Sequence, residues 1–153
     1  MGSGMRRILN YDAVERSLAN IGFTSYENVT IFQDTSLEEA ISIFTSFSIM
    51  ITAHSSQLKM LSFSHSYAIV VELRPTEASD WFGDSVFSRG PDVMDIQYYS
   101  QNKHKAINCP RVKVCDKENP KGNILADILV NETVLNETLG LAFQHQQERC
   151  RNL

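Results

Sequence analysis

The sequence is poor in the residue that builds the commonest phosphate-binding loops. It contains 7 glycines, and none lies between Gly22 and Gly83. A loop of that kind needs glycine wherever the backbone closely approaches the ligand. Neither a GxGxxG turn nor a Walker loop is present, so no nucleotide site of these two standard types is expected.

Long apolar runs are also absent. No run approaches the roughly 20 apolar residues that span a bilayer, and the N-terminus lacks the apolar core of a signal peptide. We therefore expect no membrane span in this chain. The net charge is -4 and the basic residues are scattered, which argues against a nucleic-acid partner and against a polybasic membrane surface.

Cysteines are few, and their spacing predicts no metal site. Cys109, Cys115 and Cys150 form no CxxC pair, so a zinc site would need His104 or His145 from elsewhere in the sequence. A disulfide between Cys109 and Cys115 and two reduced thiols fit equally well. The acidic residues of the central region lack a convincing ligand spacing and are interpreted as solvated charges: Glu72, Glu77, Asp80 and Asp84.

Two amphipathic helices are predicted near the N-terminus. From Asp12 to Ile21 the apolar residues fall on one helical face, with Asp12 as the cap and Gly22 as the stop. In "TSLEEAISIFTSF", Ser36 and Glu39 have the spacing of a capping box before a second apolar face.

The strands that follow are continuous apolar runs. "SIMIT" (Ser48 to Thr52) and "YAIVVEL" (Tyr67 to Leu73) do not alternate with polar residues, which is typical of strands covered on both faces of a parallel sheet. "NVTIFQD" reads as an earlier strand, and "SSQLKMLSF" as a short helix between the two apolar runs. The order predicts an α/β fold, a Rossmann-like, doubly wound and mostly parallel sheet.

The rest of the chain gives a looser pattern. After Pro75 we expect loops and one or two short helices, and then an amphipathic helical region from about Ile124 to Glu148 that Gly140 interrupts. Residues 6–100 are predicted to form the core of one domain, with residues 101–153 as a loop and helical extension of it. Three histidines in polar surroundings are predicted to lie on the surface: His65, His104 and His145.

The candidate site lies where the two apolar strands end. In open α/β sheets, ligands bind beyond the carboxyl ends of the strands, at the loops that lead into helices. His54, Ser55 and Ser56 occupy such a loop, where the helix start favours an anion such as a pyrophosphate. Glu72, at the end of the next strand, is expected to accept hydrogen bonds from a pair of ribose hydroxyls. The alternative is that His54 only caps its helix and Glu72 is an exposed carboxylate.

Three segments together resemble a known family. "RRILNYDAVERSLANIGF", "FQDTSLEEAISIFTSFSIMITAHSS" and "YAIVVELRP" resemble, in order and spacing, the C-terminal nucleotide-sugar domain of the family 61 glycosyltransferases. The resemblance covers Arg6 to about Pro75. It implies the C-terminal half of a GT-B glycosyltransferase, which binds a nucleotide-sugar donor, with a UDP-sugar first among the candidates, and holds no permanent cofactor.

The resemblance also assigns roles to residues. The family's motif histidine falls on His54, its strand-end acid on Glu72, and its arginine before "ILN" on Arg6 or Arg7, so that His54 and Glu72 would face donor phosphates and ribose. It implies a glycan or glycoprotein acceptor and the Golgi or ER lumen. The acceptor-side domain is expected outside this chain, which alone is not expected to transfer sugar efficiently.

Other features keep a second interpretation open. Where the family usually has His-Gly-Ala, this chain has His54-Ser55-Ser56, and each added Cβ restricts close backbone approach to a ligand. The alternative function is therefore a degenerate, non-catalytic Rossmann-like domain that acts as a binding module and self-associates as a homo-oligomer. Three sequons would be glycosylated in a secretory lumen: Asn28, Asn131 and Asn136.

Overall fold

The computed structural model describes residues 7–29, 34–54, 56–75, 97–107 and 126–151. These residues form a mixed α/β fold around one sheet with the strand order β1-β2-β3-β4. The first three strands, β1 (Ile49–Ala53), β2 (Ile69–Pro75) and β3 (Gln97–Ile107), run parallel. The short strand β4 (Asp127–Leu129) pairs antiparallel with β3. The prediction of a mostly parallel α/β sheet is thus confirmed.

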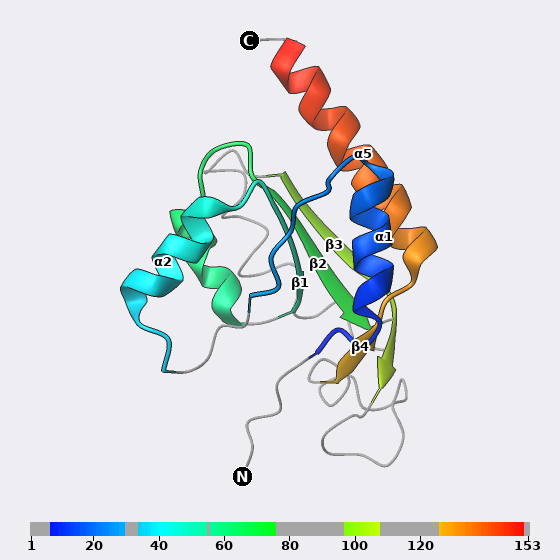
Figure 1. Ribbon diagram of the computed structural model, residues 1–153, viewed down its shortest axis with the longest axis horizontal. Helices are drawn as coiled ribbons and strands as arrows, with labels where there is room; N and C mark the ends of the chain where they lie inside the picture. The colour runs from blue at the N-terminus through cyan, green and yellow to red at the C-terminus, as the bar shows by residue number, and fades with distance from the viewer. Residues whose placement is uncertain (1–6, 30–33, 55, 76–96, 108–125, 152–153) are drawn as a thin grey trace.

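Helices cover both faces of this sheet. The helices α1 (Tyr11–Asn20) and α5 (Glu132–Arg151) lie side by side on one face, while α2 (Leu37–Ser46) and the 3₁₀ helix η1 (Ser56–Phe63, green) lie on the other (Figure 1). Strand β2 contacts both layers because successive side chains of a strand point to opposite faces. Its residues 69 to 71 are fully buried, as the continuous apolar pattern predicted.

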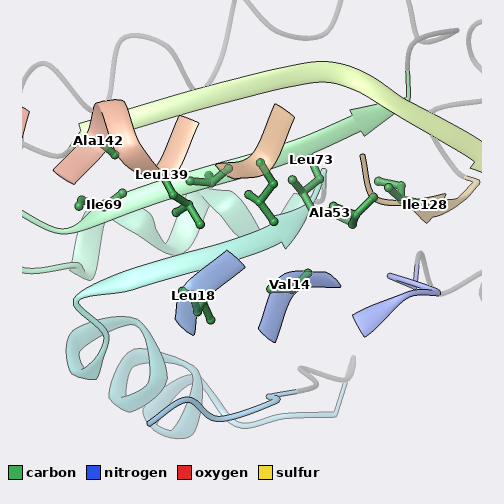
Figure 2. Close-up of a cluster of buried hydrophobic side chains, with 11 residues drawn as sticks. Val14, Leu18, Ala53, Ile69, Leu73, Ile128, Leu139 and Ala142 are labelled. Carbon is green, nitrogen blue, oxygen red and sulfur yellow. The ribbon is translucent and has the colours of Figure 1, made fainter. Parts of the chain in front are cut away.

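The main core lies between the sheet and the α1/α5 layer. Ile69, Val71 and Leu73 of β2 point to this face and pack against residues from both helices (Figure 2). The other face holds a smaller cluster that consists of Phe44, Leu58, Leu61 and Val70. The alternation along β2 therefore places every second residue from Val70 onward on the α2/η1 face.

Several predicted boundaries are corrected by the structure. Asp12 does not cap α1; Asn10 precedes this helix, and Asp12 pairs with Arg16 one turn later. Gly22, with φ at +90°, does end the helix, in the left-handed conformation that glycine adopts without strain. The predicted strand "NVTIFQD" is not formed at its described positions 28, 29 and 34, and residues 30–33 lie outside the described residues.

The C-terminal half differs more from the prediction. Gln97–Ile107 is a strand rather than a loop or short helix, and Asp127–Leu129 is a strand within the region predicted as helical. Asn10 fixes the end of β4, because its side chain donates a hydrogen bond to the Val130 carbonyl at 3.0 Å and accepts one from the Val130 amide at 2.7 Å. Helix α5 begins only at Glu132, and it continues through Gly140 without a break.

The predicted cap of α2 is confirmed and gives a first test. The Ser36 hydroxyl accepts a hydrogen bond from the Glu39 amide at 3.1 Å, which satisfies one of the unpaired N–H groups at the helix start. Ser36→Ala should lower the free energy of unfolding by about 1 kcal/mol in urea titrations. Ser42→Ala, at an exposed position within the same helix, is the control and should cost nothing measurable. Equal effects of the two changes would contradict the capping role.

Candidate functional site

The described site is a set of polar side chains on the α2/η1 face of the sheet. Glu72 and Arg74 follow Val70 at two-residue spacing along β2, so all three side chains point to this face. Glu72 is 1% exposed and Arg74 is 4% exposed. Charged side chains are this deeply buried only where partners compensate their charge. The sequence thus places two opposite charges inside an otherwise apolar strand.

His54 contributes the first of these partners. It directly follows the last residue of β1, and its backbone amide donates to the Leu73 carbonyl of β2 at 3.2 Å. The side chain is buried, and its Nδ1 forms a hydrogen bond with Oε1 of Glu72. Since a carboxylate can only accept, Nδ1 carries the hydrogen. A further hydrogen bond from the ring, to a ligand or to the protein, would therefore be made by Nε2.

Tyr98 of β3 contributes the second partner. Its hydroxyl donates to Oε2 of Glu72 at 2.5 Å. Burial, followed by the nearby negative charge of Glu72, raises the pKa of Tyr98, so the hydroxyl keeps its proton and remains a donor at neutral pH. Both oxygens of the carboxylate are therefore hydrogen-bonded, each to a different neighbouring strand.

Glu72 is the charged centre of the site. Burial alone would raise its pKa, but the hydrogen bonds from His54 and Tyr98 and the charge of Arg74 together hold the pKa below its ordinary value. The side chain is consequently ionised at neutral pH. A buried carboxylate between an imidazole and a phenol orients that imidazole, in the way that carboxylates fix catalytic and metal-bound histidines.

The sequence-predicted pair His54 and Glu72 is brought together here, with a geometry that the sequence did not suggest. Glu72 lies within β2, which continues to Pro75, and not at the strand end or on the surface. Its described hydrogen bonds go to protein side chains. Contact of His54 with donor phosphates and of Glu72 with ribose stays a prediction, although the geometry makes His54 the better placed of the two for a ligand.

The other predicted site residues are distributed differently. Ser56 is the first residue of η1, whereas Ser55 and Arg6 lie outside the described residues. Arg7 pairs with Asp127 of β4, where its guanidinium Nη2 lies 2.8 Å from the carboxylate and its amide donates to the same group at 3.0 Å. This ion pair ties the N-terminal segment to β4, across β3 from Glu72.

Sequence reasoning missed Arg74 and Tyr98. The sequence contains a pattern that points to Arg74, because the two-residue spacing from Glu72 puts both charges on one face of a strand that is otherwise apolar. No sequence pattern points to Tyr98, because its mostly polar segment does not read as a strand. Recognising it would have required the pairing of Tyr98 with Val70 in the β2–β3 register.

The prediction for the remaining histidines is confirmed in two cases. His65 and His145 are exposed, and His145 accepts or donates a hydrogen bond with the Tyr99 hydroxyl at 2.8 Å. His104 is the exception, since none of its surface is exposed. A register shift in β3 opposite Leu73 and Pro75 inserts an extra residue before it, which reverses the direction of the following side chains. Nδ1 of His104 accepts a hydrogen bond from the Asn131 amide at 3.0 Å.

In the described part of the chain, no three His, Cys, Asp or Glu side chains gather where they could hold a metal ion. None of the helices described there has the length and apolar character needed to cross a membrane. Cys150 is an exposed free thiol. Cys109, Cys115, Glu77, Asp80 and Asp84 lie outside the described residues.

Comparison with known proteins adds no family. No protein-family model matches this chain, and no curated protein matches it. An imidazole held by a buried carboxylate can take a proton from a hydroxyl, or, when protonated, donate a hydrogen bond to an anionic oxygen.

Proposed function

We propose that this domain binds the diphosphate of a nucleotide-sugar donor at His54, as part of a glycosyltransferase similar to family 61. The observation that supports this most is the buried His54–Glu72 pair, in which His54 directly follows the carboxyl end of β1 and Glu72 lies within the neighbouring parallel strand β2. This edge of an α/β sheet is where such folds bind ligands. The parallel sheet with helices on both faces is compatible with the Rossmann-like C-terminal half of a GT-B enzyme.

The chemistry fits a phosphate ligand. His54 immediately precedes the segment that leads into η1, and Glu72 holds its ring through the hydrogen bond to Nδ1. An imidazolium Nε2–H would donate to an oxygen of the diphosphate. During sugar transfer, the bond between the anomeric carbon and the diphosphate breaks, and the leaving diphosphate keeps the electron pair. A positive donor at that oxygen stabilises the developing charge.

The partners follow from the same proposal. The donor is a nucleotide sugar, with a UDP-sugar first among the candidates, and the acceptor is a glycan or a glycoprotein bound by a separate acceptor-side domain. These reactions belong to the Golgi or ER lumen, where the exposed Asn28 and Asn131 would also carry glycans.

A second candidate function has one observation in its favour. Glu72 has both oxygens bonded within the protein, and Nδ1 of His54 is one of the partners. A buried polar network whose hydrogen bonds are all made within the protein can have a purely structural role, which is to rigidify the fold. In that case the domain is a non-catalytic binding module that keeps the architecture without the donor site.

Thermal melts distinguish the two candidates. A nucleotide diphosphate that binds the folded protein should raise the free energy of unfolding by about 2.7 kcal/mol when its concentration is a hundred times its dissociation constant. We expect this shift with UDP or GDP for the wild type and expect it to be lost in His54→Asn. The asparagine side chain keeps a donor near the Nδ1 position for Glu72, but it has no equivalent of Nε2.

The matched control is His145→Asn, which changes an exposed histidine on α5 and should leave the nucleotide shift intact. Each shift is measured against the same variant without nucleotide, because His54→Asn alters stability by itself. An equal shift in His54→Asn and wild type would show that nucleotide binds elsewhere. No shift with any nucleotide in the wild type would favour the non-catalytic module.

A further inference from the structure

We propose that Tyr98 is a positioning residue that orients the His54 imidazole by holding the Glu72 carboxylate between them. The use of the oriented ring for a phosphate rests on the proposed function, whereas the positioning itself does not. The basis is the pair of hydrogen bonds to opposite oxygens of one carboxylate, from His54 on one side and from Tyr98 on the other.

The strand register explains how Glu72 of β2 and Tyr98 of β3 meet His54, which directly follows β1. Glu72 pairs with Thr52 of β1, two residues before His54, and Tyr98 pairs with Val70, two residues before Glu72. The three side chains therefore form a diagonal line across the α2/η1 face, displaced by two residues per strand. Long side chains reach such diagonal neighbours, and two-residue steps keep all of them on one face.

The second hydrogen bond matters because a carboxylate turns easily about its last torsion. The terminal torsion of glutamate is broad and has no sharp staggered minima. Without the hydrogen bond from Tyr98, one oxygen of the carboxylate loses a fixed partner, so the carboxylate can rotate more and sets the direction of the His54 ring less tightly. Tyr98 fixes the other oxygen, so the carboxylate plane and the direction of the His54 ring are set together. Glu72 is 1% exposed, so water from outside is poorly placed to replace the phenol.

Tyr98→Phe removes this constraint and little else. The ring that packs beside the smaller apolar cluster is kept, and only the hydroxyl that donates to Glu72 is lost. We expect the Nδ1–H···carboxylate bond of His54 to loosen as a result. If the proposed function holds, nucleotide affinity should fall roughly tenfold, by analogy with the lower end of what the loss of an outer partner costs at metal-bound histidines.

The direct readout is the long-range ¹H–¹⁵N NMR spectrum of the histidine rings in the ¹⁵N-labelled protein. Wild-type His54 should show a protonated Nδ1 with a slowly exchanging, downfield ring proton. In Tyr98→Phe this proton should broaden or disappear through faster exchange. Tyr99→Phe is the matched control, because it removes the neighbouring hydroxyl, which contacts His145 on the opposite face, and it should leave the His54 signals unchanged.

Each outcome decides the proposal. An unchanged His54 signature in a folded Tyr98→Phe protein would overturn it, and so would a wild-type ring that is protonated only on Nε2, even if the variant fails to fold. If no nucleotide binds to the wild type, the proposed function fails, yet the ring signature still decides whether Tyr98 positions His54. A changed signature with unchanged nucleotide affinity would support the positioning and place the ligand away from His54.

Discussion

Leu139→Ala is expected to lower the free energy of unfolding by about 3 kcal/mol, within the range of roughly 2 to 5 kcal/mol for buried leucines. Leu139 of α5 is fully buried in the main core, a cluster to which α1, β2 and β4 also contribute, and Figure 2 shows it pointing into this cluster. Its truncation removes apolar contacts within the cluster and leaves a cavity. Urea titrations measure the loss.

The same helix provides the control for this prediction. Leu141 lies two residues further along α5 and is 53% exposed, so Leu141→Ala should change the free energy of unfolding by no more than about 0.5 kcal/mol. The two variants make the same chemical change in the same helix. Similar losses for both, or a loss below about 1 kcal/mol for Leu139→Ala, would contradict the packing of α5 on the sheet.

Patterns that depend on local chemistry were predictable from the sequence. The Ser36 cap of α2 and the glycine stop of α1 are set by neighbouring residues. The strands β1 and β2 were recognisable because a strand buried on both faces must be apolar at successive positions. Their predicted ends differ from the structure by only one or two residues.

The strands β3 and β4 could not be found in that way. Gln97–Ile107 contains mostly polar residues and no apolar run, and it is held in the sheet by pairing with β2 and β4. The strand β4 is only 3 residues long, shorter than any pattern that alternation can reveal. In both cases tertiary pairing determines the structure, and the local sequence does not.

The candidate site shows the same limit. His54 and Glu72 were identified because each follows an apolar run near the end of a strand. That they bond to each other depends on the β1–β2 register, which places Thr52 opposite Glu72. Tyr98 depends in addition on β3. Residue types could suggest a site, but only the alignment of three strands reveals that Glu72 is an internal partner of His54.

Acidification is expected to destabilise the protein through His104, the histidine whose burial the sequence did not predict. Burial lowers the pKa of His104 from 6.5 to about 4. Its Nδ1 accepts the Asn131 amide at the start of α5, and protonation would remove this acceptor and leave a charge in the interior. The neutral ring is therefore part of the contact between β3 and α5.

The sign of the effect follows from proton binding. Between pH 6.5 and about 4 the unfolded chain binds a proton at this histidine and the folded protein does not, so the free energy of unfolding falls as the pH is lowered. The stabilisation is complete above pH 6.5 and lost below about 4, with a slope of about 1.4 kcal/mol per pH unit between them and a total of roughly 3 to 4 kcal/mol.

Urea titrations at several pH values measure this slope, and His104→Gln separates it from other groups. Glutamine does not titrate, and its side-chain oxygen can accept the Asn131 amide. The lowered pKa values of Glu72, Asp12 and Glu132 also cause acid destabilisation, but only below the ordinary pKa of 4.5 for the two glutamates and 3.8 for the aspartate. The free energy of unfolding of the variant should therefore depend less on pH than that of the wild type between pH 6.5 and about 4. The difference is clearest above pH 5, and the two proteins should lose stability in parallel only below about pH 4. Identical slopes above pH 5 would show that His104 is not the group that titrates.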